Sequence, residues 1–270
     1  MTAGTNISRE CIYTLILILL VSCDVRAAEP DFSKIFHDKD GCFVLYDLKA
    51  NKVAYRYNPA RCGLRVSPCS TFKVALAVMA FDRGILKDEN TTFKWDGVDR
   101  GSPGWNRDTS AADWIKYSVV WFSQRITPQL GPAGVRDYLA RFEYGNQDIS
   151  GSLTNFWLGS SLKISADEEV EFLKHLWRGE LPTSKRAMEL TRKIMYQETS
   201  PSGMRLCGKT GSHVTSASAL GWFVGHLEGK EGEYLVAINY SEANPQNMKA
   251  YPGMAAEDMC KEILKQLKIY

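Results

Sequence analysis

Runs of apolar and aromatic residues with the spacing of β-strands lie near both ends of the chain. Near the start, two such runs flank a polar turn at 47–52, which is typical of a hairpin. In the last third, another turn at 228–232 separates two longer runs. The predicted strands are Cys42–Tyr46, Val53–Tyr57, Met204–Lys209, Ala219–Leu227 and Glu233–Asn239.

Between these strands the spacing changes to that of helices. One run, Val74–Phe81, is almost wholly apolar, which indicates a buried helix that ends before Gly84. Residues 88–111 are rich in Gly, Asp, Asn, Thr and Ser and predict a long loop, and 144–165 predict an irregular stretch. The predicted helices cover 70–81, 113–124, 135–142, 166–177, 184–195 and 255–267.

Strands at both ends and helices in the middle predict an α/β fold of the α+β type. An antiparallel sheet would be assembled from N- and C-terminal strands, flanked by helices, with a helical insertion packed against it. No internal repeat or flexible linker interrupts residues 28–270, so we expect a single domain there. A site at the seam between sheet and insertion would place Ser70 at a helix start.

Composition narrows the function classes. The 270 residues include 33 basic and 31 acidic ones, a net charge of +2, and no Lys/Arg run of the kind that follows nucleic-acid phosphates. The four histidines and the cysteines lack metal-ligand spacing. The sequence therefore predicts neither a nucleic-acid partner nor a metal, and it makes no prediction of oligomeric state.

The first 27 residues are typical of an export signal. Arg9 precedes an apolar run at 12–21 that is too short to span a bilayer, and Val25-Arg26-Ala27 fits a signal peptidase site. In the alternative interpretation, Leu20-Val21-Ser22-Cys23 is a lipoprotein box and Cys23 carries the lipid, which would be the chain's only membrane attachment. Both interpretations predict an exported, periplasmic protein. An oxidising compartment also allows a Cys42–Cys62 disulfide, which the sequence leaves open.

One short stretch, Pro68-Cys69-Ser70-Thr71-Phe72-Lys73, concentrates the candidate chemistry. A hydroxyl and an amine three residues apart meet on one helix face. At a buried helix start, the dipole and unpaired N–H groups favour an oxyanion, and burial pushes Lys73 towards its neutral, basic form. Ser70 is therefore a candidate nucleophile and Lys73 its base.

Three further motifs follow in order: Ser118-Val119-Val120, Tyr144-Gly145-Asn146 and Lys209-Thr210-Gly211-Ser212. Together with Trp157-Leu158 and Gly221–Gly225, this order over residues 40–268 resembles the class D, oxacillinase-type serine β-lactamases. A class A enzyme would have Ser-Asp-Asn in place of Ser118-Val119-Val120. The resemblance implies the fold of the serine β-lactamases and penicillin-binding proteins.

The resemblance also implies a reaction. Ser70 attacks the lactam carbonyl of a penicillin-type antibiotic, and Lys73, carbamylated by CO₂ to N6-carboxylysine, acts as general base; no other cofactor is implied. Trp157 would hold the carbamate, and Ser118 would pass a proton to the leaving nitrogen. The remaining implied groups are Lys209 for positive potential, Ser70 and Ser212 for the oxyanion hole, and Thr210, Gly211, Ser212, Val120, Tyr144 and Asn146 for substrate binding.

One departure from the family concerns the substrate carboxylate. Many class D enzymes bind it with an Arg at the start of the last helix, whereas Ala255-Ala256-Glu257 has none. Thr210, Ser212, Lys209 and His213 are the candidates to replace it.

The main alternative function is a β-lactam sensor or penicillin-binding domain that acylates and deacylates slowly. Such sensors usually follow several membrane spans, and this chain has one short apolar segment. A transpeptidase would be expected to have Ser-x-Asn where Ser118-Val119-Val120 stands. The absence of a G-x-S-x-G motif disfavours a Ser-His-Asp hydrolase.

Overall fold

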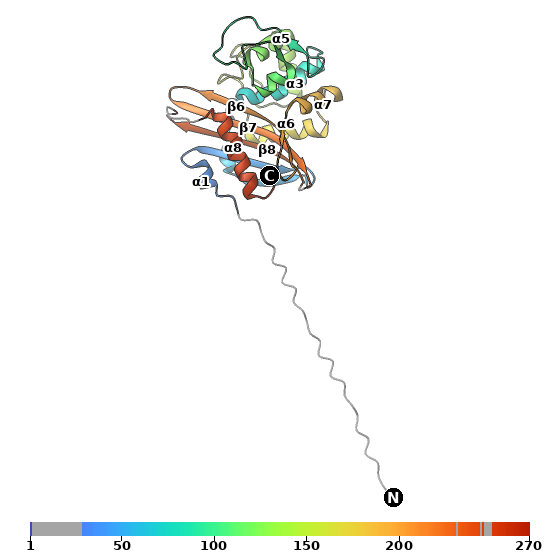
Figure 1. The fold of residues 1–270 in the computed structure, drawn as a ribbon, viewed down its shortest axis with the longest axis vertical. Helices are drawn as coiled ribbons and strands as arrows, with labels where there is room; N and C mark the ends of the chain where they lie inside the picture. The colour runs from blue at the N-terminus through green and yellow to red at the C-terminus, as the bar shows by residue number, and fades with distance from the viewer. Residues whose placement is uncertain (2–28, 231, 244, 246–249) are drawn as a thin grey trace.

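A six-stranded antiparallel sheet forms the centre of the fold in the computed structural model (Figure 1). The structure describes residue 1 and residues 29–270 except 231, 244 and 246–249. The strand order is β2-β1-β8-β7-β6-β5, so the two ends of the chain meet in the middle of the sheet. Its strands are β1 (Asp40–Asp47), β2 (Lys52–Tyr57), β5 (Tyr196–Thr199), β6 (Arg205–Val214), β7 (Ser218–Gly229) and β8 (Gly232–Ala243).

Pairing of β1 with β8 joins the N-terminal hairpin to the C-terminal strands, as the sequence predicts. Phe43 lies opposite Ile238 and Leu45 opposite Val236, and all four side chains are buried. Because successive side chains point to opposite faces, the neighbouring residues Cys42 and Val44 are buried on the other face. Both faces of this central pair are therefore covered, which confirms the α+β architecture.

Two hydrophobic cores lie on the two faces of the sheet. On one face lie α1 (Phe32–Phe36) and α8 (Pro252–Gln266) (Figure 1). These helices bury side chains such as Phe36, Ile263 and Leu264 against the sheet. The larger core on the other face includes the helical layer. The helices of that layer are α3 (Phe72–Asp82), α4 (Ala111–Lys116), α5 (Val120–Arg141), α6 (Ala166–Arg178) and α7 (Lys185–Ile194), and the short α2 (Pro59–Cys62) follows β2.

The structure corrects the prediction of a continuous helix over 113–124. That segment is two helices, because α4 ends at Lys116 and α5 begins at Val120. Ser118 lies between them with a φ of 56°, a left-handed conformation that a helix does not contain. Helix α5 then runs to Arg141, with one non-helical residue at Gly131, and so includes the helix predicted at 135–142.

Other differences are smaller. Strand β5 was missed because Tyr196–Thr199 is exposed and lacks an apolar pattern. The region 88–111, predicted as a loop, contains the short paired strands β3 (Thr92–Phe93) and β4 (Thr109–Ser110).

The export signal and Cys23 lie outside the described residues. Within the described part of the chain, no helix is long and apolar enough to cross a membrane.

Cys42 and Cys62 are both buried free thiols in the structure. The Cys62 Sγ donates to the Tyr57 carbonyl oxygen at 3.1 Å, and the Asn239 amide donates to the Cys42 Sγ at 3.4 Å. Each thiol therefore has a polar partner without a disulfide.

The core beneath α8 gives a first prediction. Leu264 is fully buried, so Leu264→Ala should lower the free energy of unfolding by about 2–5 kcal/mol. Urea denaturation followed by circular dichroism measures this change. The matched control is Leu64→Ala, whose parent side chain is 49% exposed and whose effect should stay within about 0.5 kcal/mol. Equal losses in the two variants would contradict this assignment of the core.

Candidate active site

Ser70 and Lys73 lie side by side at the entrance to α3. Ser70 is the middle residue of a 3₁₀ turn, Cys69–Thr71 (η1), and the α-helix itself begins at Phe72, two residues later than predicted. The Lys73 Nζ donates to the Ser70 Oγ at 2.8 Å. The predicted contact between hydroxyl and amine is therefore present, although a tighter turn presents the serine.

Lys73 has almost no access to water. Its side chain is fully buried, and burial, followed by repulsion from Lys209, lowers its pKa well below the ordinary value. Within the described residues, no carboxylate forms an ion pair with it. A neutral amine in hydrogen-bond contact with a serine is able to accept that hydroxyl's proton.

A cleft of about 420 Å³ opens beside Ser70. Besides Ser70, three predicted site residues line it: Ser118 at the α4–α5 junction, and Thr210 and Ser212 on β6. The left-handed backbone at Ser118 keeps this residue out of both helices and in the cleft wall. The cleft is lined by Ser70, Arg100, Gly101, Ser102, Trp105, Lys116, Tyr117, Ser118, Thr210, Ser212, Tyr251 and Met254.

Strand β6 approaches the η1 turn closely, and Gly211 makes this approach possible. A Cβ at Gly211 would lie 2.9 Å from the Pro68 carbonyl oxygen. On the other side, the Gly253 backbone N–H donates to the Ser212 Oγ at 2.9 Å, which ties β6 to the start of α8. The turn with Ser70 is thus fixed against the strand with Ser212.

Lys209 lies buried at the base of this region. Its Nζ donates to the Thr210 carbonyl oxygen at 3.0 Å and contacts the Thr210 Oγ1 at 3.3 Å. Burial lowers its pKa to about 7, against a smaller opposing effect of Glu257. Lys209 therefore changes charge near neutral pH.

Trp157 packs beside the η1 turn that contains Ser70. Its ring centroid lies 5.5 Å from that of Phe72, and the side chain is fully buried. The indole Nε1 is a buried donor without a hydrogen-bond partner among the described residues. Because a buried donor without a partner costs free energy, this N–H is suited to an acceptor that binds between Trp157 and the turn.

Other predicted residues do not line the cleft. Tyr144 is buried, with its hydroxyl on Glu169, and Asn146 caps a loop by bonding the Ser161 carbonyl and the Lys163 N–H. Val120 is half-buried in the first turn of α5. Tyr144 and Asn146 thus form hydrogen bonds that hold the loops around the site, and the substrate-binding role of all three residues stays a prediction.

Several cleft residues were missed by the sequence analysis. Arg100 and Trp105 belong to the segment predicted as a loop, and Lys116 and Tyr117 precede the Ser118 motif. Lys116 is an exposed cation at the end of α4, whereas His213 is packed against Gly159 and does not line the cleft. No change in hydrophobic period sets these residues apart in the sequence.

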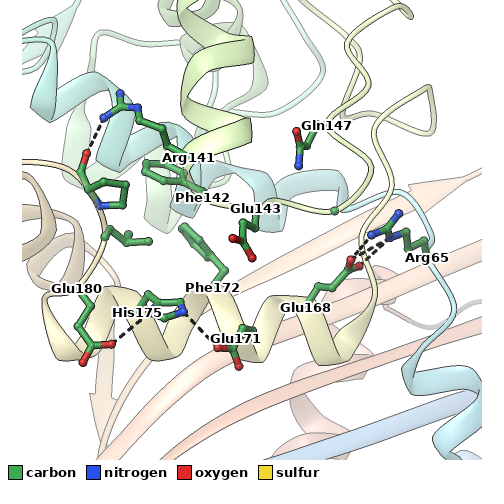
Figure 2. A pocket seen from close by; sticks show the side chains of 13 residues that line it. Arg65, Arg141, Phe142, Glu143, Gln147, Glu168, Glu171, Phe172, His175 and Glu180 are labelled. Atoms are coloured by element: carbon green, nitrogen blue, oxygen red, sulfur yellow. Dashed lines mark hydrogen bonds and ion pairs between the residues drawn. The ribbon is translucent and has the colours of Figure 1, made fainter.

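A larger cavity, of about 510 Å³, lies along α6 (Figure 2). Several of its charged or ionisable groups pair with one another: Arg65 binds Glu168, and His175 lies 3.2 Å from both Glu171 and Glu180. It lacks a serine, a thiol or a buried lysine. In the parts of the chain that the structure describes, no cluster of three or more metal-binding side chains is present. The smaller cleft is therefore the candidate active site.

Comparisons with known proteins found relatives over most of the chain. The family model described as penicillin binding protein transpeptidase domain matches residues 41–265. Beta-lactamase OXA-1 of Escherichia coli is 40% identical over 220 residues, 78% of this chain and 79% of that protein. The solved class D beta-lactamase from Bacillus subtilis has a TM-score of 0.81 at 34% identity, covering 90% of this chain and 98% of that one.

A third relative is not named as a β-lactamase. The methicillin resistance mecR1 protein of Staphylococcus aureus is 34% identical over 235 residues. The match covers 87% of this chain but only 39% of that protein.

The buried lysine of β6 gives a second prediction. In degassed buffer, the Lys209 side chain should lose its proton with a midpoint near pH 7, the value to which burial lowers its pKa. Nitrogen-15 NMR of the lysine side chains measures this midpoint, and Lys209→Met assigns the signal. Lys261 is the internal control: burial lowers its pKa, but its bonds to Glu198 and Glu257 outweigh burial and raise the pKa overall. A Lys209 that stays charged to alkaline pH would contradict the prediction.

Proposed function

Because this chain belongs to the class D serine β-lactamases, we propose that it hydrolyses the lactam amide of penicillin-type antibiotics through an acyl-enzyme on Ser70 and confers resistance to them. The observation that carries the proposal is the 2.8 Å contact between the Ser70 Oγ and the buried Lys73 Nζ at the edge of the cleft. The export signal predicted for residues 1–27 fits a periplasmic enzyme that meets the drug there.

In the acylation step, Lys73 takes the Ser70 proton while the oxygen attacks the lactam carbonyl. The backbone N–H groups of Ser70 and Ser212 bind the developing oxyanion, where loss of one donor typically costs about 10²–10³ in turnover. Ser118 lies on the cleft wall and passes a proton to the nitrogen as the amide bond breaks. Thr210, Ser212 and the charge of Lys209 bind the substrate carboxylate.

We further propose that Lys73 works as a carbamate. Two features support the fit: a neutral amine is the form that takes up CO₂, and the unpartnered Trp157 N–H is suited to the carbamate oxygens. The carbamate supplies an anionic general base, worth roughly 10²–10⁴ in rate, for acylation and then deacylation. Phe72 and Trp157 keep water away from this amine.

Carbamylation also bears on Lys209. The positive charge of Lys209 lowers the pKa of Lys73, so the two side chains interact electrostatically. A negative charge on Lys73 would stabilise the Lys209 ammonium in return. Lys209 would then be charged at neutral pH when the enzyme is ready to bind an anionic substrate.

The second candidate function is a domain that β-lactams acylate but that deacylates slowly. The match to the mecR1 protein favours keeping it, since that protein is named for methicillin resistance and not as a β-lactamase. The two candidates share acylation of Ser70 and differ in the lifetime of the adduct.

The third prediction separates these candidates. Intact-mass spectrometry of the protein with excess benzylpenicillin and bicarbonate should show an adduct on Ser70 that disappears as penicilloate accumulates. Ser70→Ala should form no adduct, since it lacks the nucleophile. An adduct that persists for hours would support the slowly deacylating domain, and no adduct in the unmodified protein would overturn both candidates.

The fourth prediction tests the carbamate. Removal of bicarbonate should lower turnover by about 10²-fold or more, and its return should restore activity. In the same titration, bicarbonate should raise the pKa of Lys209. Trp157→Phe should need more bicarbonate for half-maximal activity because it lacks the indole N–H.

Lys73→Ala serves as the control for this experiment. It should acylate slowly at most, deacylate almost not at all, and show no rescue by bicarbonate. Activity of the unmodified protein that is indifferent to bicarbonate would contradict the carbamate mechanism.

A further inference from the structure

A buried carboxyl group that the mechanism does not use lies beneath the nucleophile turn. Glu169, on α6, is fully buried. Its Oε1 lies 2.7 Å from the Thr71 Oγ1 and accepts from the Tyr144 hydroxyl at 3.0 Å. Thr71 follows Ser70 directly, so Glu169 contacts the turn that presents the nucleophile.

The protons around Thr71 can be counted. The Thr71 hydroxyl oxygen lies 2.8 Å from the Pro68 carbonyl oxygen and 2.7 Å from Glu169, but a hydroxyl has only one proton. A carbonyl oxygen only accepts, so the contact with Pro68 requires the Thr71 hydroxyl to donate its one proton there. The proton in the contact between Thr71 and Glu169 must then come from Glu169. A protonated carboxyl group satisfies both contacts at once.

The surroundings of Glu169 also favour a neutral group. Its second oxygen, Oε2, is buried without a hydrogen-bond partner. The titratable groups that face it are Tyr144, on the loop after α5, and Glu168, on its own helix. Glu168 is already paired with Arg65 (Figure 2). Since no cation among the described residues lies beside it, a charged Glu169 would leave an uncompensated anion in the core.

We propose that Glu169 is a positioning residue that works in its protonated form. Its O–H donates to Thr71, whose O–H donates to Pro68, and this chain of hydrogen bonds fixes the turn that presents Ser70. The role of this turn in catalysis rests on the proposed function, whereas the protonated state of Glu169 does not.

The proposal gives the site a pH limit. Burial raises the pKa of Glu169 to about 7, although its hydrogen bonds to Thr71 and Tyr144 oppose the shift. Between the ordinary glutamate pKa and this value, the folded protein holds a proton that the unfolded chain has lost. The free energy of unfolding therefore falls as pH rises through this window, and the loss is complete above it.

The fifth prediction uses Glu169→Gln, whose amide is neutral at every pH and has two protons for the Thr71 and Tyr144 oxygens. The unfolding equilibrium constant of the unmodified protein, relative to the variant, should rise about tenfold per pH unit across the window. Infrared difference spectra without substrate should show a protonated carboxyl band that disappears near pH 7 and that the variant lacks.

Glu168→Gln is the matched control. Burial raises the Glu168 pKa, but its bonds to Arg65 and Ser165 outweigh burial and lower it. Its removal should therefore destabilise the protein more at neutral than at acid pH, the opposite sign to Glu169→Gln. Two results would overturn the proposal. One is a protonated carboxyl band that survives in Glu169→Gln. The other is a free energy of unfolding that depends on pH in the same way in the unmodified protein and in Glu169→Gln.

Activity provides the last readout. The turnover of the unmodified protein should decline as pH rises past about 7, and Glu169→Gln should lack this limb. Glu169→Leu, which has neither donor nor acceptor, should lose activity at every pH. If the protein hydrolyses no β-lactam, the infrared and unfolding measurements still decide whether Glu169 is protonated. Equal alkaline limbs in the unmodified protein and Glu169→Gln would contradict the positioning role.

Discussion

The contact between the Lys73 Nζ and the Ser70 Oγ depends on a buried amine that has no carboxylate beside it in the described part of the chain. A lysine in water is charged and strongly hydrated, and a carboxylate partner would keep it charged after burial. Desolvation without a counter-ion removes the proton instead and leaves a base in contact with a hydroxyl. The surrounding aromatic side chains provide this desolvation, because Phe72, Phe156 and Trp157 exclude water from the turn.

The sheet provides the other half of the site. Strand β6 carries Lys209, Thr210 and Ser212, and it lies close enough to the turn only because Gly211 has no side chain. Strand β6 is held by β7, and β7 by β8, which pairs with β1 from the other end of the chain. The site therefore requires the complete sheet, with the helical layer above it, before the nucleophile and the substrate-binding strand can face each other.

The sequence predicted the parts of this arrangement that depend on spacing. The apolar run after Lys73, the i to i+3 pairing and the strands at both ends are local patterns, and the structure contains all of them. It could not predict the break at Ser118, because a single left-handed residue between two helices leaves no change in hydrophobic period. Strand β5 was missed for another reason, since its exposed residues lack an apolar pattern. Glu169 lies 98 residues from Thr71, so its role appears only when α6 packs under the turn.

Among the ionisable side chains buried around this turn, desolvation shifts Lys73, Lys209 and Glu169 towards their neutral forms. It lowers the pKa of Lys73 and Lys209 and raises that of Glu169. The two kinds of shift set opposite limits: rising pH frees the Lys73 amine to act as a base, and the same rise ionises Glu169. The proposed carbamate on Lys73 would relax the lower limit, because it would provide an anionic base whose formation is set by CO₂ as well as by pH. The upper limit remains, since no cation among the described residues is positioned to neutralise Glu169, and the site is therefore most ordered below the pH at which this carboxyl group ionises.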